Sequence, residues 1–326
     1  MSNMEAGLTF PCPEATSSSP HRHLSNPALI TLARGGRSGS IGIGSCYGTF
    51  GELLQGVLPE DDGDFLVSLP ITASSTASFR WTPDTDGIRV QPAHKVKSVQ
   101  IAALVLEHFR AAKAGSLRID SDLPEGKGLA SSTADLVATA RAVSNALGAV
   151  LTPALLEELL RKIEPTDGVL YPGIVAMNHR AVRLRASLGT LPALTIVGID
   201  EGGVVDTIKF NKTPRSFSAA ARREYAVLLD SITAAVARND LVSVGKIATR
   251  SALMNQELLP KQDLEAVLGI CRDIGALGVV AAHSGTMLGI MLDGLDQRYR
   301  ERLSSALDGA AAISGDVSVY HTAELR

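Results

Sequence analysis

The sequence lacks several features that would each define a class of protein. Its 326 residues include only three cysteines, Cys12, Cys46 and Cys271, and these form no CxxC pair. An odd, scattered set does not build a disulfide framework and fits a reducing cytoplasm. No stretch reaches the roughly 18 apolar residues that a membrane-spanning helix needs, and no basic start followed by an apolar run indicates a signal peptide. We therefore expect a soluble, cytoplasmic protein without a structural metal site.

An excess of charge of one sign is also missing. The formal net charge is −3, and 20% of the residues are charged. We therefore expect neither a nucleic-acid partner, because no basic field would attract one, nor a membrane surface, because there is no polybasic run. The charge does not exclude a small-molecule ligand, including an anionic one. The length and the 45% hydrophobic content are enough for a large core in one bilobed unit or two domains.

The order of predicted elements is that of a mixed α+β protein. Residues 1–38, rich in Ser and Pro, predict a flexible tail. From Ile41 onward, short apolar or alternating runs predict strands: IGIGSCYG, FLVSLPI, TASFRW and GIRVQP. A helical pattern between Ser98 and Ala114 is followed by a strand, SLRID, that leads directly into the segment PEGKGLASST. A helix closed by Gly148 comes next.

The second half alternates in the same way. Thr152 and Pro153 are a cap and a first-turn proline for a short apolar helix, which stops at EPTDG. Strands are predicted in VRLRAS, ALTIVGI, GVVAAHSGTMLGIML and DVSVYH, and helices in residues 216–257, 261–274 and 297–307. No repeat of 20 to 50 residues indicates a solenoid.

The segment PEGKGLASST has the chemistry of a phosphate-binding loop. Gly126 and Gly128 remove side chains where a backbone must approach an anion, and the following helix offers unpaired N–H groups and a positive dipole end. Lys127 adds a point charge, and the hydroxyls of residues 131–133 can reach phosphate or Mg²⁺. A glycine-rich turn with serine caps also occurs without any ligand, so composition alone leaves both interpretations open.

Two common nucleotide-binding patterns are absent. The loop lacks the GK[ST] ending of the P-loop, and GIGSCYG breaks the GxGxxG spacing of the dinucleotide fold by one residue. What the segment PEGKGLASSTAD does resemble is the Pro-x-Gly-x-Gly-Leu-x-Ser-Ser motif of the GHMP kinases. GTFGELLQG (48–56) and AHSGTMLGIM (282–291) stand where that family has its other motifs, so the resemblance covers about residues 41–320.

This resemblance implies a two-lobed α+β fold. Residues 39–180 would form a nucleotide lobe with a mixed sheet, and residues 181–326 a ferredoxin-like α/β sandwich lobe. Within the family, the motifs GELLQG, GKGLASSTAD and EPTDGVLYPG look most like those of the L-threonine kinases of cobalamin biosynthesis. The resemblance therefore implies an ATP- and Mg²⁺-dependent kinase that phosphorylates the hydroxyl of a small amino acid, with a homodimer left open.

Site residues follow from the same resemblance. Ser132 and Glu164 would bind Mg²⁺, Asp167 would accept the proton of the substrate hydroxyl, and Lys127 would neutralise charge. Because only two residues separate Glu164 from Asp167, a shorter interval than in the mevalonate-kinase-like pattern, their roles could be exchanged or one could be absent. The ATP phosphates would lie on the whole loop: Pro124, Glu125, Gly126, Lys127, Gly128, Leu129, Ala130, Ser131, Ser132 and Thr133. Substrate contacts would come from Asp167 and from Glu52, Gln55, His283, Ser284 and Gly285.

Each of these residues also has a simpler interpretation. Asp167 could make an Asx turn before Gly168. Glu52 and Gln55, which suit an ammonium and a carboxylate, could be surface residues at a helix start. His283 could be an ordinary strand-end histidine, and the basic group Lys209, Lys212 and Arg215 a solvated loop. For the whole chain, two alternatives remain: a kinase for homoserine, another amino alcohol or a specialised metabolite, and a non-catalytic ligand-binding regulator.

Overall fold

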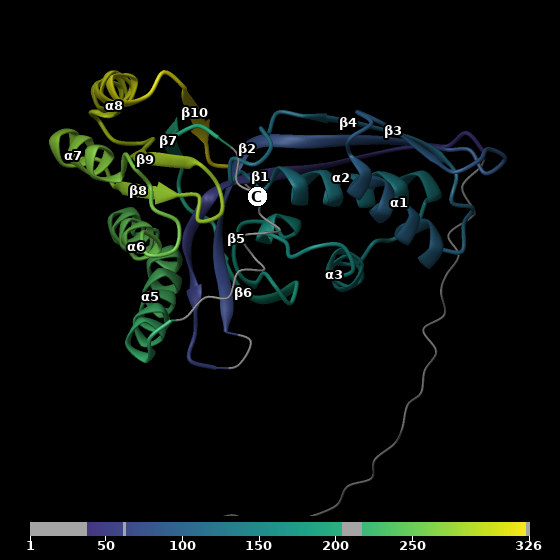
Figure 1. Cartoon of the computed structure of the whole chain (residues 1–326), viewed down its shortest axis with the longest axis horizontal. Helices are drawn as coiled ribbons and strands as arrows, with labels where there is room; N and C mark the ends of the chain where they lie inside the picture. The colour runs from purple at the N-terminus through teal and green to yellow at the C-terminus, as the bar shows by residue number, and fades with distance from the viewer. Residues whose placement is uncertain (1–37, 61–62, 204–216, 324–326) are drawn as a thin grey trace, which may run out of the picture. The chain divides into compact units, whose positions relative to one another are not determined.

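The computed structural model describes residues 38–60, 63–203 and 217–323, which all belong to one unit, Ala33–Arg326. The predicted tail and the basic group Lys209, Lys212 and Arg215 lie outside the described residues. A ten-stranded sheet has the order β10-β7-β9-β8-β1-β2-β4-β3, and β5 pairs with β2 and β6 (Figure 1). Its strands are β1 (Ile41–Val57), β2 (Asp64–Trp81), β3 (Ile88–Gln91), β4 (Gly115–Ser121), β5 (Ile174–Asn178), β6 (Arg183–Gly189), β7 (Leu194–Asp200), β8 (Gly278–Ala281), β9 (Met287–Asp293) and β10 (Val317–His321).

The helices follow the predicted order. They are α1 (Val96–His108), α2 (Ser131–Leu147), α3 (Pro153–Arg161), α5 (Ala219–Ala237), α6 (Leu241–Asn255), α7 (Leu264–Ile274) and α8 (Tyr299–Ile313), with a short 3₁₀ turn, η1 (Gly168–Leu170). The predicted cap of α3 is present, since Thr152 accepts a hydrogen bond from the N–H of Leu155 at 3.3 Å. The mixed α+β class is confirmed.

Two long strands carry the first half of the sheet. β1 and β2 pair antiparallel from Ile41 opposite Arg80 to Val57 opposite Asp64, with register shifts between Tyr47 and Leu54. The runs FLVSLPI and TASFRW, predicted as separate strands, are one strand, β2. The register shifts fall within GTFGELLQG, so this motif occupies an irregular stretch of β1, the kind of bulge that redirects side chains.

Helix α2 packs directly on β1, and two glycines of the IGIG run make this possible. A Cβ at Gly42 would lie 2.1 Å from the carbonyl oxygen of Ala142, and one at Gly44 would lie 2.3 Å from that of Ala138. Figure 1 shows α1 and α2 on the same side of strands β1 to β4. These glycines therefore serve close packing between helix and strand, not phosphate binding.

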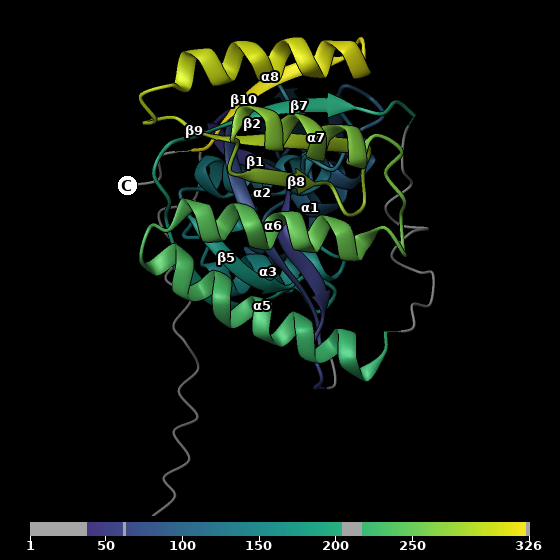
Figure 2. The same cartoon turned by 90° about the vertical axis from the view of Figure 1, so that its left-hand side faces the viewer.

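The second half builds its own helical layer. α6 packs on β8 and β1, α7 on β8 and β9, and α8 on β7 and β9; Figure 2 shows these helices facing the viewer across the strands. The two parts of the sheet meet where Glu52 of β1 pairs with Ala281 of β8. A division into lobes at residue 180 stays a prediction. Within the described residues, no helix is long and apolar enough to cross a membrane.

Candidate active site

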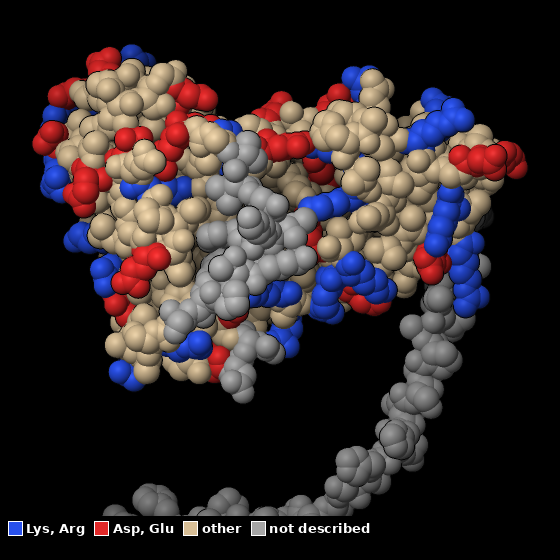
Figure 3. Space-filling model, in the orientation of Figure 1, with Lys and Arg blue, Asp and Glu red and all other residues tan. Residues whose placement is uncertain are grey.

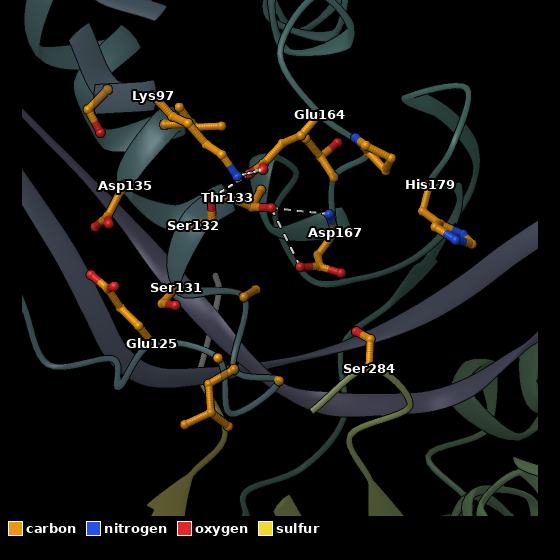
Figure 4. Close-up of a pocket in the computed structure, with 18 of the residues that line it drawn as sticks. Lys97, Glu125, Ser131, Ser132, Thr133, Asp135, Glu164, Asp167, His179 and Ser284 are labelled. Atoms are coloured by element: carbon orange, nitrogen blue, oxygen red, sulfur yellow. Dashed lines mark hydrogen bonds and ion pairs between the residues drawn. The ribbon is translucent and has the colours of Figure 1, made fainter. Parts of the chain in front are cut away.

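A cavity of about 380 Å³ lies where the predicted motifs converge. Its walls come from β1, from the start of α1, from the 124–133 loop with the start of α2, and from the turn between α3 and η1 (Figure 4). Of the loop predicted to bind ATP, eight residues line the cavity: Glu125, Gly126, Gly128, Leu129, Ala130, Ser131, Ser132 and Thr133. Glu52, Gln55, Glu164, Asp167 and Ser284 line it as well.

The 124–133 loop places the N-terminus of α2 at this cavity. Gly126 and Gly128 adopt positive φ angles of 73° and 87°, a conformation that glycine reaches without steric cost. Ala130, a residue with a Cβ, is also left-handed, at φ 58°. The N-cap residue of α2 is Ala130, which makes no side-chain capping bond, and no described side chain is recorded as capping this end. Its first N–H groups are therefore available to an anion, as a phosphate site requires.

Three distant motifs are fitted together through glycines. A Cβ at Gly128 would lie 2.3 Å from the Cβ of Ala282, and one at Gly285 would lie 2.2 Å from the carbonyl oxygen of Lys127. The Gly51 N–H donates to the Gly128 carbonyl at 3.1 Å. The 124–133 loop thus lies between GTFGELLQG and AHSGTMLG, with no room for a side chain at these contacts.

Ser132 and Glu164, the two predicted Mg²⁺ ligands, are brought into contact. The Ser132 hydroxyl donates to Glu164 Oε1, and Lys97 Nζ forms an ion pair with Glu164 Oε2. Glu164 follows the end of α3, and Ser132 is the second residue of α2, so the contact connects two elements at the mouth of the loop. Figure 4 shows Lys97, Ser132 and Glu164 pointing toward one another.

Asp167 is partly buried beside the same helix end. Its backbone N–H donates to Thr133 Oγ1 at 3.4 Å, and its carboxylate lies 3.5 Å from that hydroxyl. Burial, together with the negative charges of Glu52 and Glu164, raises the pKa of Asp167 to about 7. Asp167 precedes η1, but its side chain makes no capping bond there. The Asx-turn interpretation is therefore wrong, and the carboxyl faces the cavity.

Glu52 and Gln55 lie on β1 and are 3% and 7% exposed, so the interpretation as surface residues at a helix start is wrong. The backbone N–H and Nδ1 of His283 both lie 3.0 Å from Glu52 Oε2. Nδ1 must carry the proton because both of its neighbours, Glu52 Oε2 and a backbone carbonyl, are acceptors. Nε2 lies 2.8 Å from Ser251 Oγ, within hydrogen-bond distance. His283 therefore orients Glu52 from outside the cavity.

Lys127 lies elsewhere than expected. Its ammonium forms an ion pair of 2.5 Å with Asp200 at the end of β7 and donates to the carbonyl of Gly203 at 2.8 Å. Asp200 also accepts from the Thr286 hydroxyl at 2.6 Å. Burial opposes ionisation of Asp200, but these hydrogen bonds lower its pKa. Lys127 thus connects the loop to the second half of the chain. Pro124, His283 and Gly285 also lie outside the cavity lining.

Sequence reasoning missed the basic residues at the start of α1. Lys95 pairs with Glu125 at 2.5 Å and with buried Asp135 at 2.6 Å, and Lys97 pairs with Glu164. A signal was present, because two lysines at a helix N-terminus oppose the helix dipole. Overall charge could not reveal them, because both signs are mixed over the surface: Figure 3 shows Lys and Arg side chains interspersed with Asp and Glu on the face that it draws.

The comparisons agree with this geometry. Residues 96–171 match the family model described as the GHMP kinases N terminal domain. The L-threonine kinases of Citrobacter freundii and Salmonella typhimurium strain LT2 are each 29% identical to this chain, over 260 and 263 residues. These alignments cover 77% and 78% of this chain and 86% and 84% of those proteins.

Solved structures share the fold. Homoserine kinase from Cytophaga hutchinsonii superposes with a TM-score of 0.67 at 18% identity, covering 87% of this chain and 95% of that one. MDDEF in complex with MVAPP, AMPPCP and magnesium superposes with a TM-score of 0.62 at 17% identity, covering 86% and 97%. The family match lies inside the cavity-forming half, and kinases align over most of the sequence. Residues 96–171 are thus similar to the N-terminal domain of GHMP kinases, and the similarities support an ATP-dependent small-molecule kinase.

Proposed function

We propose that this protein transfers the γ-phosphoryl group of ATP to the side-chain hydroxyl of L-threonine, giving O-phospho-L-threonine and ADP. The observation that carries the choice of threonine is the alignment with two L-threonine kinases over more than three quarters of the chain. The resemblance of the motifs extends the proposal to a cytoplasmic role in making the aminopropanol linker of cobalamin, or in a related pathway.

The residues at the start of α2 fit a Mg²⁺–nucleotide. Ser132 and Glu164 present a hydroxyl and a carboxylate oxygen in direct contact, and oxygen ligands are what Mg²⁺ prefers. Within the described residues, no group of three or more His, Cys, Asp or Glu side chains could hold a metal by itself. Mg²⁺ in kinases needs no such cage, because substrate phosphates and water complete its coordination. When bound, the ion would neutralise charge on the phosphates.

Phosphoryl transfer depends mainly on positioning and on charge neutralisation. The open N–H groups of α2 would hold the phosphates over the loop, with Ser132 and Glu164 at its mouth. Asp167 would accept the proton of the threonine hydroxyl as the oxygen attacks. A pKa of about 7 suits this role, since a general base works best when its pKa is near the operating pH.

The amino-acid end of the substrate would lie against β1. Gln55 Oε1 is buried and has no hydrogen-bond partner among the described residues, and Glu52 faces the same cavity. A buried acceptor without a donor is costly unless a ligand supplies one. An ammonium group would do so, which supports an amino acid or amino alcohol. Thr166 Oγ1 is also buried at the cavity wall, with no partner in the described part of the chain, and would bind a further polar group of the substrate.

The second candidate is a kinase for homoserine or another amino alcohol. The homoserine kinase fold favours it, and the same acceptors would bind its ammonium group. A non-catalytic regulator is disfavoured, because the Ser132–Glu164 pair and Asp167 form a site that a simple binder would not need.

The test is an ADP-release assay with Mg²⁺–ATP and a panel of alcohols. The panel contains L-threonine, L-homoserine, L-serine, L-allo-threonine and 1-amino-2-propanol, and ³¹P NMR identifies the product. We expect L-threonine to give the highest kcat/KM. Turnover with another alcohol and none with L-threonine would refute the proposed substrate and leave the kinase assignment standing.

A further inference from the structure

The cavity is rich in carboxylates, so the binding of a negatively charged nucleotide depends on the cations that line it. Five carboxylates line it: Glu52, Glu125, Asp135, Glu164 and Asp167. Two lysines, Lys95 and Lys97, line it as well, together with the histidines His94 and His179. A polyphosphate entering this cavity meets a largely negative wall, and Mg²⁺ alone offsets only part of that charge. A protein cation at the phosphates would offset more of this charge.

Two of the available lysines are already engaged. Lys127, the cation expected from the sequence, is held by Asp200 at 2.5 Å and lies outside the cavity lining. Lys95 bridges Glu125 at 2.5 Å and Asp135 at 2.6 Å, and its side chain is only 12% exposed. Burial opposes the charge on Lys95, but these two carboxylates raise its pKa, so it stays a fixed structural cation. Moving it would leave Asp135 buried and unpaired, which is costly.

Lys97 differs in each of these respects. Its side chain is 35% exposed, the most open of the three lysines, and the carboxylate that it contacts is Glu164. Glu164 also accepts from Ser132 at the start of α2, so the Lys97 ammonium already lies beside the helix end that would receive phosphate. If Glu164 turns to Mg²⁺, Lys97 loses its partner at the point where new negative charge arrives.

We propose that Lys97, not Lys127, is the lysine that binds the nucleotide phosphates, and that it exchanges Glu164 for a phosphate oxygen when Mg²⁺–ATP binds. In the nucleotide-free protein the ion pair satisfies Glu164; in the loaded protein the ammonium neutralises phosphate charge. This inference rests on the proposed ATP site at the 124–133 loop and is independent of the identity of the acceptor alcohol.

Calorimetric titration of the full chain with Mg²⁺–AMPPCP, without any acceptor, tests the proposal. Because a hydrogen bond to a charged group is strong, Lys97→Met should weaken binding by about tenfold or more. Lys97→Arg keeps the charge and should remain within about threefold of the wild type. The matched control is Lys113→Met, which removes an exposed lysine paired with Glu107 at 2.7 Å outside the cavity. It should leave the affinity unchanged, and Lys127→Met should weaken binding less than Lys97→Met does.

Each other outcome counts against the proposal. Equal or tighter binding by Lys97→Met would show that the lysine merely masks Glu164, and this would overturn the exchange. Lys97→Gln, compared by circular dichroism and titration, replaces Lys97→Met if the latter fails to fold. If the wild type itself does not bind Mg²⁺–AMPPCP, the ATP site at the loop is wrong and this inference falls with it. A threonine-specific failure in the turnover assay would leave this result untouched.

Discussion

Replacing Asp167 with asparagine separates the stability of this site from its activity. Desolvation and the nearby charges of Glu52 and Glu164 raise the pKa of the Asp167 carboxyl to about 7 in the folded protein, from an ordinary value of 3.8. An acid whose pKa is raised by folding favours the folded state at low pH, and it destabilises that state increasingly as pH rises toward the folded value. The neutral amide of Asp167→Asn carries no such cost, so the variant should gain stability over the wild type as pH rises.

The size of the effect follows from the two pKa values. Ionising the buried carboxyl costs the fold about 2 kcal/mol at pH 5 and about 4 kcal/mol at pH 8, as an upper bound for a single independent group. The advantage of Asp167→Asn should therefore grow by about 2 kcal/mol between these pH values. Urea unfolding at pH 5, 6, 7 and 8 measures it. Asp308→Asn, which changes an exposed aspartate on α8, is the matched control and should show no trend.

Activity should change in the opposite direction. Loss of the proposed general base should lower kcat by about 10² to 10⁴, and the acid limb of the wild-type pH profile, near pH 7, should disappear. A stability difference that stays flat between pH 5 and pH 8 would show that Asp167 is not an ionisable group in a desolvated site. Full turnover by Asp167→Asn would remove its role as base. The two results are independent, so either can fail alone.

The remaining predictions concern the frame of the site. Ser251→Ala leaves two buried hydrogen-bonding groups without a partner, so we expect a loss of about 1–3 kcal/mol in urea unfolding and a higher KM for the acceptor, with the KM for ATP unchanged. Gly285→Ala places a Cβ 2.2 Å from a carbonyl of the phosphate loop and should weaken Mg²⁺–AMPPCP binding in calorimetry; unchanged affinity would contradict that contact. Gly42→Ala should destabilise by about 1–3 kcal/mol through the clash with α2. Gly269→Ala lies inside α7, where a Cβ would meet only the Arg272 side chain at 3.9 Å. It should stabilise by about 0.5–1 kcal/mol, the opposite sign to Gly42→Ala, and urea unfolding measures both.

The sequence predicted well those features that depend on local patterns. The order of strands and helices, the cap of α3 and the glycine loop before α2 follow from periodicity and turn chemistry over a few residues. The contact between Ser132 and Glu164 was predicted only as shared ligation, because the resemblance supplied it. The partner of Lys127 was not predictable: Asp200 lies 73 positions away on β7, and nothing in the local pattern of either residue encodes that pairing.

The glycine motifs also show that a local sequence pattern does not reveal contacts between distant parts of the chain. GIGSCYG, PEGKGLASST and AHSGTMLG all contain glycine pairs, and sequence pattern alone cannot tell a phosphate cradle from a close contact between backbones. The structure separates them: the Cβ positions of Gly42 and Gly44 would overlap α2, and that of Gly285 would overlap the phosphate loop, whereas Gly126 lines the cavity. The glycines of GIGSCYG and AHSGTMLG therefore allow close backbone packing, whereas those of PEGKGLASST lie at the cavity. A substitution at Gly42 should thus change stability without changing nucleotide specificity, whereas one at Gly285 should change the binding of the nucleotide.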